Sequence, residues 1–348
     1  MYNSSTTYKN DILNTINGIH NPTKLFGKRI LITGATGLLG GFLVDVLLML
    51  NRYQGYNISV WALGRSRERL ESRFISHLSD DNLNFLIQDV TEPIEVDEEF
   101  DYIFHFAGDG YPEAFAIRPV ETMTPALFGT YHLLRKARKN KECVFLMVST
   151  GEIYGVVSSS KPIKEEEYGY VDIGKTRSCY PSSKRAAETM CAAFGEEYGC
   201  NTIIARLSHV YGGCTSNKDN RATAQFLECA AKGEDIILHS AGLQLRSYTY
   251  VADAVLGILV TVLSGKNGEA YNVANPKSRV TISEFARVTA EVGGVDCIFD
   301  CELDGNSTPI SYAVLDTEKI EKLGYVARYS IEAGIRNSLL IQREVGNG

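Results

Sequence analysis

The chain has 348 residues, which is enough for one large or two modest domains with a sizeable core. Its 44% hydrophobic and 22% charged residues are typical of a globular protein. A net charge of -7 without a long basic run, and the lack of an uninterrupted apolar stretch of membrane-spanning length, argue against nucleic acid and membranes as partners. The eight cysteines form no C-x-x-C pair, and no His cluster accompanies Cys297 and Cys301. We therefore expect reduced thiols, no metal site and a cytoplasmic location.

The first predicted strand and helix flank a glycine-rich loop. Residues 1–27 are expected to form a leading arm, and residues 28–33 form a short buried strand before the loop. Glycines let the backbone turn tightly and approach a pyrophosphate, and the helix predicted over 42–50 supplies amide donors and a positive dipole. The predicted cofactor contacts in this loop are Gly34, Thr36, Gly37, Leu38, Leu39 and Gly40.

The second predicted strand, residues 58–63, ends in Gly64-Arg65-Ser66-Arg67. An NAD site often has an acidic residue here for the ribose 2′-hydroxyl, whereas two arginines and a serine suit a 2′-phosphate. Arg65 is therefore a predicted cofactor contact that favours NADP. The same residues also fit the solvated start of a charged helix, so both NAD and NADP remain open.

Two further strands are predicted to end beside the cofactor. Residues 84–87 form the third strand, after which the Asp89-Val90 pair follows, with Asp89 expected to reach the adenine amine. Residues 101–106 form the fourth strand and lead into the Ala107-Gly108 turn over the cofactor. His105 lies within an apolar run, so we interpret it as a core residue rather than a catalyst.

The rest of the chain continues the alternation of strands and helices and then loses it. The pattern up to residue 210 comprises a helix over 120–140 kinked at Pro125, a strand over 143–148, a helix over 180–198 and a strand over 201–206. This alternation predicts an α/β fold in which residues 28–210 form a doubly wound parallel (Rossmann) sheet with helices on both faces. Segments about 236–275 are expected to return to this domain, whereas 211–235 and 276–348 form a smaller C-terminal substrate-binding lobe.

A tyrosine and a lysine stand four residues apart on the helix that follows the central strand. Tyr180 and Lys184 would share one helix face, where the ammonium favours the ionised phenol and lowers its pKa toward neutrality. Such a tyrosine can take the proton from a hydroxyl group while hydride leaves the same carbon. Ser149 and Thr150 end the buried strand over 143–148, at the edge where open α/β sheets place their chemistry.

Over about residues 28–340 the chain resembles the extended short-chain dehydrogenase/reductase family, specifically its nucleotide-sugar epimerases, dehydratases and decarboxylases. The resemblance rests on Thr33-Gly34-x-x-Gly37-x-x-Gly40, Ser149-Thr150-x-Glu152-x-Tyr154-Gly155, Tyr180-x-x-x-Lys184, Ala205-Arg206-x-x-x-x-Tyr211-Gly212 and Arg246-Ser247-Tyr248-x-Tyr250-Val251-x-Asp253. Within the family, Gly174-x-x-Arg177-Ser178-Cys179-Tyr180-x-x-x-Lys184-Arg185 is most similar to the UDP-glucuronate decarboxylases, which also carry a loop like Asp219-Asn220-Arg221.

The resemblance implies a role for each matching residue. Tyr180 would be the base that starts oxidation at the sugar C4, and Lys184 would bind the nicotinamide ribose and tune Tyr180. Thr150 would hydrogen-bond the C4 oxygen, Glu152 would serve the later step, and Arg246 would bind the nucleotide diphosphate. The resemblance also implies that Ser149 contacts the cofactor and that the substrate contacts include Gly151, Arg177, His209 and Arg221.

Several positions depart from the family pattern. Gly151 replaces the aspartate that donates a proton to the leaving hydroxyl in the dTDP-glucose dehydratases. Ala126 and His209 stand where asparagines are usual, and Gly213-Cys214 replaces a Pro-Arg pair. We therefore expect a transient 4-ketone followed by decarboxylation, with UDP-glucuronate as substrate, and keep a 4-epimerase and a 4,6-dehydratase as alternatives.

The resemblance also implies a tightly bound NAD or NADP, a nucleotide-sugar substrate and a homodimer. The dimer would pair the helices over 120–140 and 180–198 with their copies. Two further alternatives are a carbonyl reductase that exchanges free NADPH and a non-catalytic protein that senses dinucleotides on the same fold. The presence of Thr150, Tyr180 and Lys184 together argues against the non-catalytic protein, and the contexts of Glu152 and Arg246 argue against the reductase.

Overall fold

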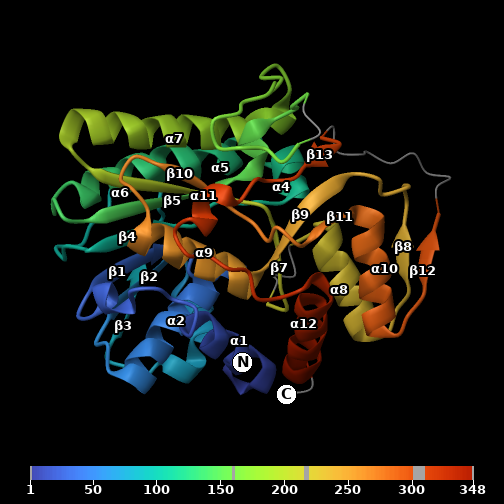
Figure 1. The fold of residues 1–348 in the computed structure, drawn as a ribbon. Coiled ribbons are helices and arrows are strands. Elements are labelled where there is room, and N and C mark those ends of the chain that lie inside the picture. Colours follow the sequence, from blue (N-terminus) through green and yellow to red (C-terminus); the bar gives the residue numbers. More distant parts are fainter. Residues whose placement is uncertain (1, 159–160, 215–218, 301–309, 347–348) are drawn as a thin grey trace.

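The chain is built around one parallel sheet (Figure 1). The computed structural model describes residues 2–158, 161–214, 219–300 and 310–346, so Cys301 lies outside the described residues. Seven strands pair in the order β10-β6-β5-β4-β1-β2-β3, each pair parallel. They are β1 (Arg29–Thr33), β2 (Ser59–Gly64), β3 (Leu83–Ile87), β4 (Tyr102–His105), β5 (Val144–Thr150), β6 (Asn201–Leu207) and β10 (Ala270–Val273). The predicted doubly wound sheet is confirmed, and its strand order reverses beside β1, where such sheets hold ligands.

Helices cover both faces of the sheet (Figure 1). One face carries α5 (Pro119–Thr124), α6 (Thr130–Ala137) and α7 (Cys179–Tyr198); the other carries α1 (Thr6–Ile16), α2 (Leu38–Gln54) and α9 (Val251–Ser264). The helix α9 is buried along 251–263, because it packs against the strands β6 and β10 and against the helices α1 and α2. A helix that is apolar all round is stable only in such a position. Shorter helices are α3 (Arg67–Arg73), α4 (Pro112–Ile117) and the single turns η1 (Tyr2–Ser4), η2 (Pro22–Leu25), η3 (Ile75–His77), η5 (Gly151–Tyr154) and η6 (Thr176–Ser178).

The helix predicted over 120–140 is interrupted in the structure. A π-helical turn, η4 (Pro125–Gly129), separates α5 from α6, which ends at Ala137. Proline lacks the amide hydrogen that an α-helix needs at this point, so the regular ladder cannot continue. The ring of His105 contacts the Pro125 carbonyl at 3.1 Å and the Thr33 hydroxyl at 2.9 Å. His105 is fully buried, which confirms its interpretation as a core residue.

A smaller lobe lies beside the carboxyl edge of the sheet (Figure 1). Its strands are β7 (His209–Tyr211), β8 (Ile236–Leu238), β9 (Leu245–Tyr250), β11 (Arg279–Thr281), β12 (Cys297–Phe299) and β13 (Tyr312–Ala313), and its helices are α8 (Ala222–Lys232), α10 (Ile282–Gly293) and α12 (Ile331–Gly346). The short helix α11 (Glu318–Glu321) contacts β10 and α9. Of the segment about 236–275, only α9 and β10 join the sheet domain. By contrast, β8 pairs with β12, and β9 pairs with β11 antiparallel, so both lie in the lobe.

The N-terminal arm is held at two points by buried polar contacts. The Tyr8 hydroxyl of α1 donates to Asp45 of α2 at 2.6 Å, and Arg73 donates to the same carboxylate at 2.7 Å. Asp11 accepts a hydrogen bond from the Tyr250 hydroxyl of β9 at 2.6 Å. The arm therefore contacts both the sheet domain and the lobe. None of the described helices combines the length and the apolar character needed to cross a membrane.

Candidate active site

A cavity of about 400 Å³ opens between the carboxyl edge of the sheet and the lobe, and the glycine loop forms one end of it. Gly34 has a φ of 64°, and a Cβ there would come within 2.9 Å of the Ala107 amide nitrogen. A Cβ on Gly40 would lie 2.5 Å from the Gly34 carbonyl. Both positions therefore need glycine, and the loop leaves room in front of the N-terminus of α2. This arrangement fits the pyrophosphate of a dinucleotide.

The predicted cofactor residues divide into two groups. Those that line the cavity are Gly34, Gly37, Leu38, Leu39, Gly40, Gly108, Ser149, Tyr180 and Lys184. Those outside its lining are Thr36, Arg65, Asp89, Val90 and Ala107. Arg65 and Asp89 lie beside each other, with 3.9 Å between guanidinium nitrogen and carboxylate oxygen; Arg65 is exposed and Asp89 is half-buried. Val90 instead packs in the core next to Gly129.

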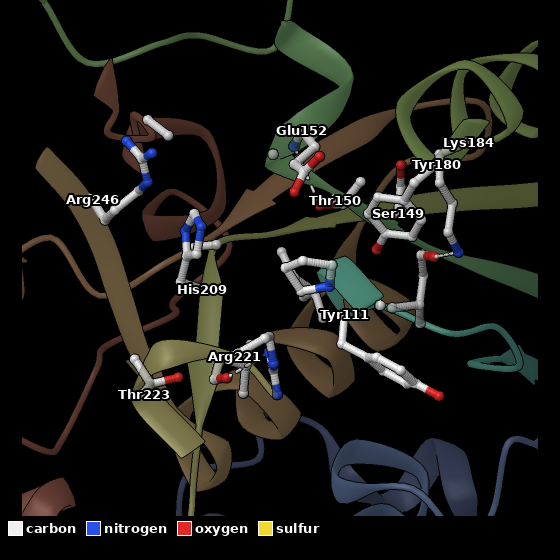
Figure 2. Close-up of a pocket in the computed structure, with 18 of the residues that line it drawn as sticks. Tyr111, Ser149, Thr150, Glu152, Tyr180, Lys184, His209, Arg221, Thr223 and Arg246 are labelled. Atoms are coloured by element: carbon white, nitrogen blue, oxygen red, sulfur yellow. Dashed lines mark hydrogen bonds between the residues drawn. The ribbon is translucent and has the colours of Figure 1, made fainter. Parts of the chain in front are cut away.

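The end of β5 and the start of α7 place the predicted tyrosine and threonine in one wall (Figure 2). Thr150 caps the turn η5, since its hydroxyl accepts from the Glu152 amide at 3.2 Å. Tyr180 and Lys184 lie in the first two turns of α7 and both line the cavity, as their spacing predicts. The Tyr180 ring stacks on Phe115 of α4, with 4.7 Å between ring centroids. This stack fixes the plane of the phenol.

The expected lowering of the Tyr180 pKa is not what the structure gives. Burial and then the charge of Glu152 raise the pKa of Tyr180 to about 12, against the effect of a hydrogen bond with Thr150. The Lys184 ammonium donates to the Val148 carbonyl at 2.8 Å, so its hydrogen bond goes to the backbone rather than to the phenol. Burial lowers the pKa of Lys184 to about 8, and the carboxylate of Glu188 opposes that change. The spacing correctly predicted that Tyr180 and Lys184 share a helix face, but burial, rather than the Lys184 charge, determines the direction in which the pKa of Tyr180 shifts.

Ser149 points toward α7. Its hydroxyl donates to Glu188, and Glu188 forms an ion pair with Arg206 of β6 at 2.7 Å. All three side chains are buried. Ser149 itself lines the cavity, whereas Glu188 and Arg206 lie behind the wall.

Glu152 and Arg177 form an ion pair inside the cavity. One guanidinium nitrogen of Arg177 donates to both Glu152 carboxylate oxygens, at 2.9 and 3.1 Å. The guanidinium also lies 4.7 Å from the centroid of the Phe115 ring, within cation–π distance. Gly151 lines the same wall between Thr150 and Glu152. This part of the cavity therefore holds one carboxylate and one cation.

The opposite wall, from the lobe, carries His209, Arg221 and Arg246 (Figure 2). Arg221 is paired with Asp219 at 2.6 Å and donates to the Val210 carbonyl at 3.1 Å. Arg246 is buried and donates to the Leu245 carbonyl at 3.1 Å. Burial, Arg246 and Arg221 lower the pKa of His209 to about 3, so its ring is neutral near pH 7. The cavity thus has a cationic wall facing the Tyr180 wall.

The structure adds residues to the site that the sequence analysis did not find. Tyr111 and Phe115 come from the segment around α4, Thr223 from α8 and Tyr248 from β9. The sequence shows Asp219 only as part of a loop motif, although an Asp side chain that can bond the amide two residues on is a signal for a local turn. Its carboxylate does accept from the Arg221 amide at 3.1 Å. Phe115 and Thr223 stand in no recognisable motif.

A doubly wound sheet with a glycine loop and a Tyr-Lys pair at its carboxyl edge defines a protein of the short-chain dehydrogenase/reductase type. Comparison with known proteins narrows this class. The chain belongs to the NAD dependent epimerase/dehydratase family, whose model matches residues 30–274. The resemblance seen in the sequence motifs is therefore confirmed.

The chain is similar to several UDP-glucuronic acid decarboxylases. It is 33% identical over 270 residues to UDP-glucuronic acid decarboxylase 1 of Xenopus tropicalis, a match that covers 77% of this chain and 61% of that protein. It is 32% identical to UDP-glucuronic acid decarboxylase 6 of Arabidopsis thaliana, over 76% of this chain and 74% of that protein. The chain thus spans about three fifths of the length of the vertebrate relatives it matches.

Solved structures share the fold at lower identity. UDP-glucose 4-epimerase of Thermotoga maritima, determined with UDP-glucose, matches with a TM-score of 0.75 and 23% identity over 91% of this chain and 99% of that chain. UDP-glucuronic acid 4-epimerase of Bacillus cereus, in complex with UDP-glucuronic acid and NAD, matches with a TM-score of 0.75 and 20% identity over 91% and 99%. At these identities the likeness establishes the fold alone.

Proposed function

We propose that this protein is an enzyme that oxidises C4 of a nucleotide sugar with a bound NAD or NADP, and that it decarboxylates UDP-glucuronate. The observation that carries the proposal is the composition of the Tyr180 wall. Thr150 and Glu152 flank Gly151 there, so the position between them offers no acid. The similarity to UDP-glucuronic acid decarboxylases supports the same choice of substrate.

The glycine loop suits the cofactor pyrophosphate, and Ser149, Tyr180 and Lys184 stand where the nicotinamide half would lie. The bound nicotinamide would accept the hydride from C4 and return it. Arg65 has a neighbouring carboxylate, Asp89, so a 2′-phosphate would have to compete with that pair. Both coenzymes therefore belong in the assay.

In the proposed reaction Tyr180 takes the proton of the C4 hydroxyl while Thr150 donates a hydrogen bond to the same oxygen. The resulting C4 ketone leaves the sugar carboxylate β to a carbonyl, so the bond from C5 to the carboxyl carbon can break. Its electron pair passes into the C4 carbonyl as carbon dioxide leaves. C5 must then take up a proton, which comes from solvent because the overall reaction consumes one. Glu152, which follows Gly151 on this wall, would relay it.

Arg246 and Arg221 would bind the diphosphate on the opposite wall, with neutral His209 between charged neighbours as a hydrogen-bonding group.

Dehydration is the less favoured outcome because of Gly151. A 4,6-dehydratase must protonate a hydroxyl leaving from C6, and glycine has no proton to give. A Cβ added at Gly151 would lie 3.3 Å from a methyl group of Leu315, so a side chain there would also displace this neighbour. Epimerisation expels nothing, and a 4-epimerase therefore remains the second candidate.

The test is an incubation with UDP-glucuronate in the presence of NAD or NADP, with products analysed by mass. Parallel reactions use dTDP-glucose, UDP-glucose and GDP-mannose. Release of carbon dioxide from UDP-glucuronate is the expected result. Efficient loss of water from a neutral hexose would overturn the proposal, and an unchanged mass with an altered C4 configuration would favour the epimerase.

The proposal includes a homodimer. Apolar side chains stand exposed on the face made by α5, η4, α6 and α7, among them Val120 (65% exposed), Phe128 (53%) and Tyr198 (41%). A two-fold contact would cover this face with its own copy. Light scattering at micromolar concentration is expected to give twice the monomer mass, and a monomer would count against this part.

The proposal also includes a cytoplasmic location, since the seven cysteines in the described part of the chain are free.

A further inference from the structure

We infer that Glu188 is a positioning residue of this site: its carboxylate, held by Arg206, orients Ser149 and supplies the counter-charge for Lys184 from behind the cavity wall. The inference rests on the proposed function in assigning Lys184 to the cofactor side. Glu188 stands one turn after Lys184 on α7, so the two side chains share a helix face. It does not line the cavity and cannot touch a ligand there directly.

The contacts of Arg206 explain why a carboxylate is tolerated at this depth. The guanidinium donates to Glu188 through Nε at 3.1 Å and Nη2 at 2.7 Å. It also donates to the Tyr154 hydroxyl at 3.1 Å, the Glu165 carbonyl at 2.6 Å and the Tyr168 hydroxyl at 3.1 Å. All five N–H groups of the guanidinium therefore have acceptors. A buried ion pair is stable only when its remaining hydrogen bonds are made in this way.

Glu188 also faces the end of the strand β5. Its carboxylate accepts a hydrogen bond from the Ser149 hydroxyl, and the carbonyl of the preceding residue, Val148, accepts one from Lys184 at 2.8 Å. The end of β5 is thus tied to α7 by two adjacent contacts. Loss of the carboxylate would free the Ser149 hydroxyl and leave Lys184 without its anion.

The groups that face Lys184 come from several elements. Glu188 and Cys191 lie on its own helix, and both affect its pKa. Burial raises the pKa of Cys191, which is therefore a neutral thiol. His105 of β4 feels the charge of Lys184, and its pKa is lowered to about 3 by burial and by that charge, so it is neutral as well. Tyr180, with a pKa near 12 from burial, is a neutral phenol. Among the described groups facing Lys184, Glu188 is thus the anion. Arg206 contacts Glu188, and it affects Lys184 by way of that carboxylate.

The direction of the effect follows from these charges. Burial lowers the pKa of Lys184 to about 8 although Glu188 raises it. Glu188→Gln removes the opposing charge, so the pKa of Lys184 must fall further. Arg206→Gln leaves the carboxylate with Lys184 as its neighbouring cation, so the pKa of Lys184 must stay or rise. If the two substitutions acted only by disturbing the packing around Lys184, they would shift its pKa in the same direction.

The experiment is a pH titration of the full-length protein with ¹³Cε-labelled lysine, read by NMR. Lys184→Met assigns the signal, and thermal melts establish that each variant is folded. In Glu188→Gln we expect the Lys184 pKa to fall by about one unit or more, which is about tenfold in proton affinity. In Arg206→Gln we expect no fall. Ser149→Ala, which keeps both charges, is the matched control and should titrate like the natural chain.

An unchanged Lys184 pKa in Glu188→Gln, or equal falls in both charge variants, would overturn the inference. If Glu188→Gln does not fold, Arg206→Gln decides, because a fall there contradicts the proposed counter-charge and an unchanged or higher value supports it. The titration needs no sugar, so it remains decisive even if UDP-glucuronate is not the substrate. Where turnover is found, the alkaline limb of the pH–rate profile should move to lower pH in Glu188→Gln.

Discussion

Tyr180 illustrates how a side chain can meet a geometric expectation and fail an electrostatic one. It lies on the same helix face as Lys184 and beside Thr150, yet burial and Glu152 raise its pKa to about 12. A phenol with this pKa is protonated at neutral pH, so Tyr180 must lose its own proton before it can take one from the C4 hydroxyl. Its stacking on Phe115 keeps the hydroxyl in place meanwhile.

Tyr180→Phe tests this residue with the least structural change. The ring and its stack on Phe115 are kept, while the acid–base group is lost. We expect turnover to fall by about 10²-fold or more, with the melting temperature and cofactor binding retained. Near-normal turnover in this variant would remove Tyr180 from its proposed role.

Arg65→Ala tests the choice of coenzyme. If Arg65 binds a 2′-phosphate, the variant should bind NADP much more weakly than the natural chain, with NAD affinity unaltered. Fluorescence titration with each coenzyme measures both affinities, and Arg336→Ala is the control, since Arg336 is an exposed arginine of α12 that pairs with Glu332. Equal changes for NAD and NADP would make Arg65 a surface residue with no part in coenzyme choice.

At the scale of the helices, the contact between α1 and α2 is the one that the sequence pattern did not predict. Asp45 of α2 is fully buried and accepts from Tyr8, Arg73 and His77. Burial alone would raise the pKa of Asp45, but Arg73 and the hydrogen bonds from His77 and Tyr8 lower it to about 2. The helix that begins at the glycine loop is thereby fixed to the N-terminal arm.

This lowered pKa has a consequence for acid stability. The folded pKa lies below the ordinary value of 3.8, so the carboxylate stabilises the fold above about pH 4 and loses that effect as the pH falls toward 2. Asp45→Asn should therefore lower the free energy of unfolding by about 2 kcal/mol near neutral pH, and the deficit should shrink in acid. Urea unfolding at a series of pH values measures it. A deficit that does not depend on pH would contradict the assignment, and exposed Glu332→Gln serves as the control.

The sequence predicted the elements with regular patterns and missed those that depend on distant partners. Strands such as β1 and β5 are continuous apolar runs because both faces of a parallel sheet are buried. The strands β12 and β13 are only three and two residues long, too short to be predicted from a pattern, and each is defined by its pairing with β8 or β9. In the site, the four-residue spacing of Tyr180 and Lys184 was enough to predict that they share one helix face. The contributions of Phe115 and Glu188 were not, because they arise from tertiary contacts.

As a whole, the molecule consists of a sheet domain and a lobe that share the wall of one cavity. Arm residue Asp11 connects them further, since it accepts from Tyr250 of β9 at 2.6 Å, from Tyr329 at 2.7 Å and from Asn337 of α12 at 2.8 Å. Its pKa is raised by burial against these three bonds. The family model begins only at residue 30, so this arm is an addition to the matched region.

Asp11→Ala should destabilise the protein markedly. Three donors, two of them tyrosine hydroxyls, would lose their acceptor, and the buried Tyr250 hydroxyl alone, left unsatisfied, costs about 1–3 kcal/mol. Urea unfolding should show a loss of at least about 2 kcal/mol, compared with a negligible effect for exposed Asp81→Ala. A loss no larger than that of Asp81→Ala would mean that the arm is not held by this carboxylate.

The position of this arm bears on how a ribosome delivers the protein. The helix α1 is synthesised before its partners Tyr329 and Asn337, which lie 318 and 326 residues after Asp11 in the chain. Parts of a growing chain fold as their contacts become available, with earlier segments first. The contacts of α1 with α2 can therefore form early in synthesis, whereas those with Tyr329 and Asn337 must wait for the C-terminal part of the lobe. During that interval the side of α1 that faces the lobe is open to chaperones and proteases.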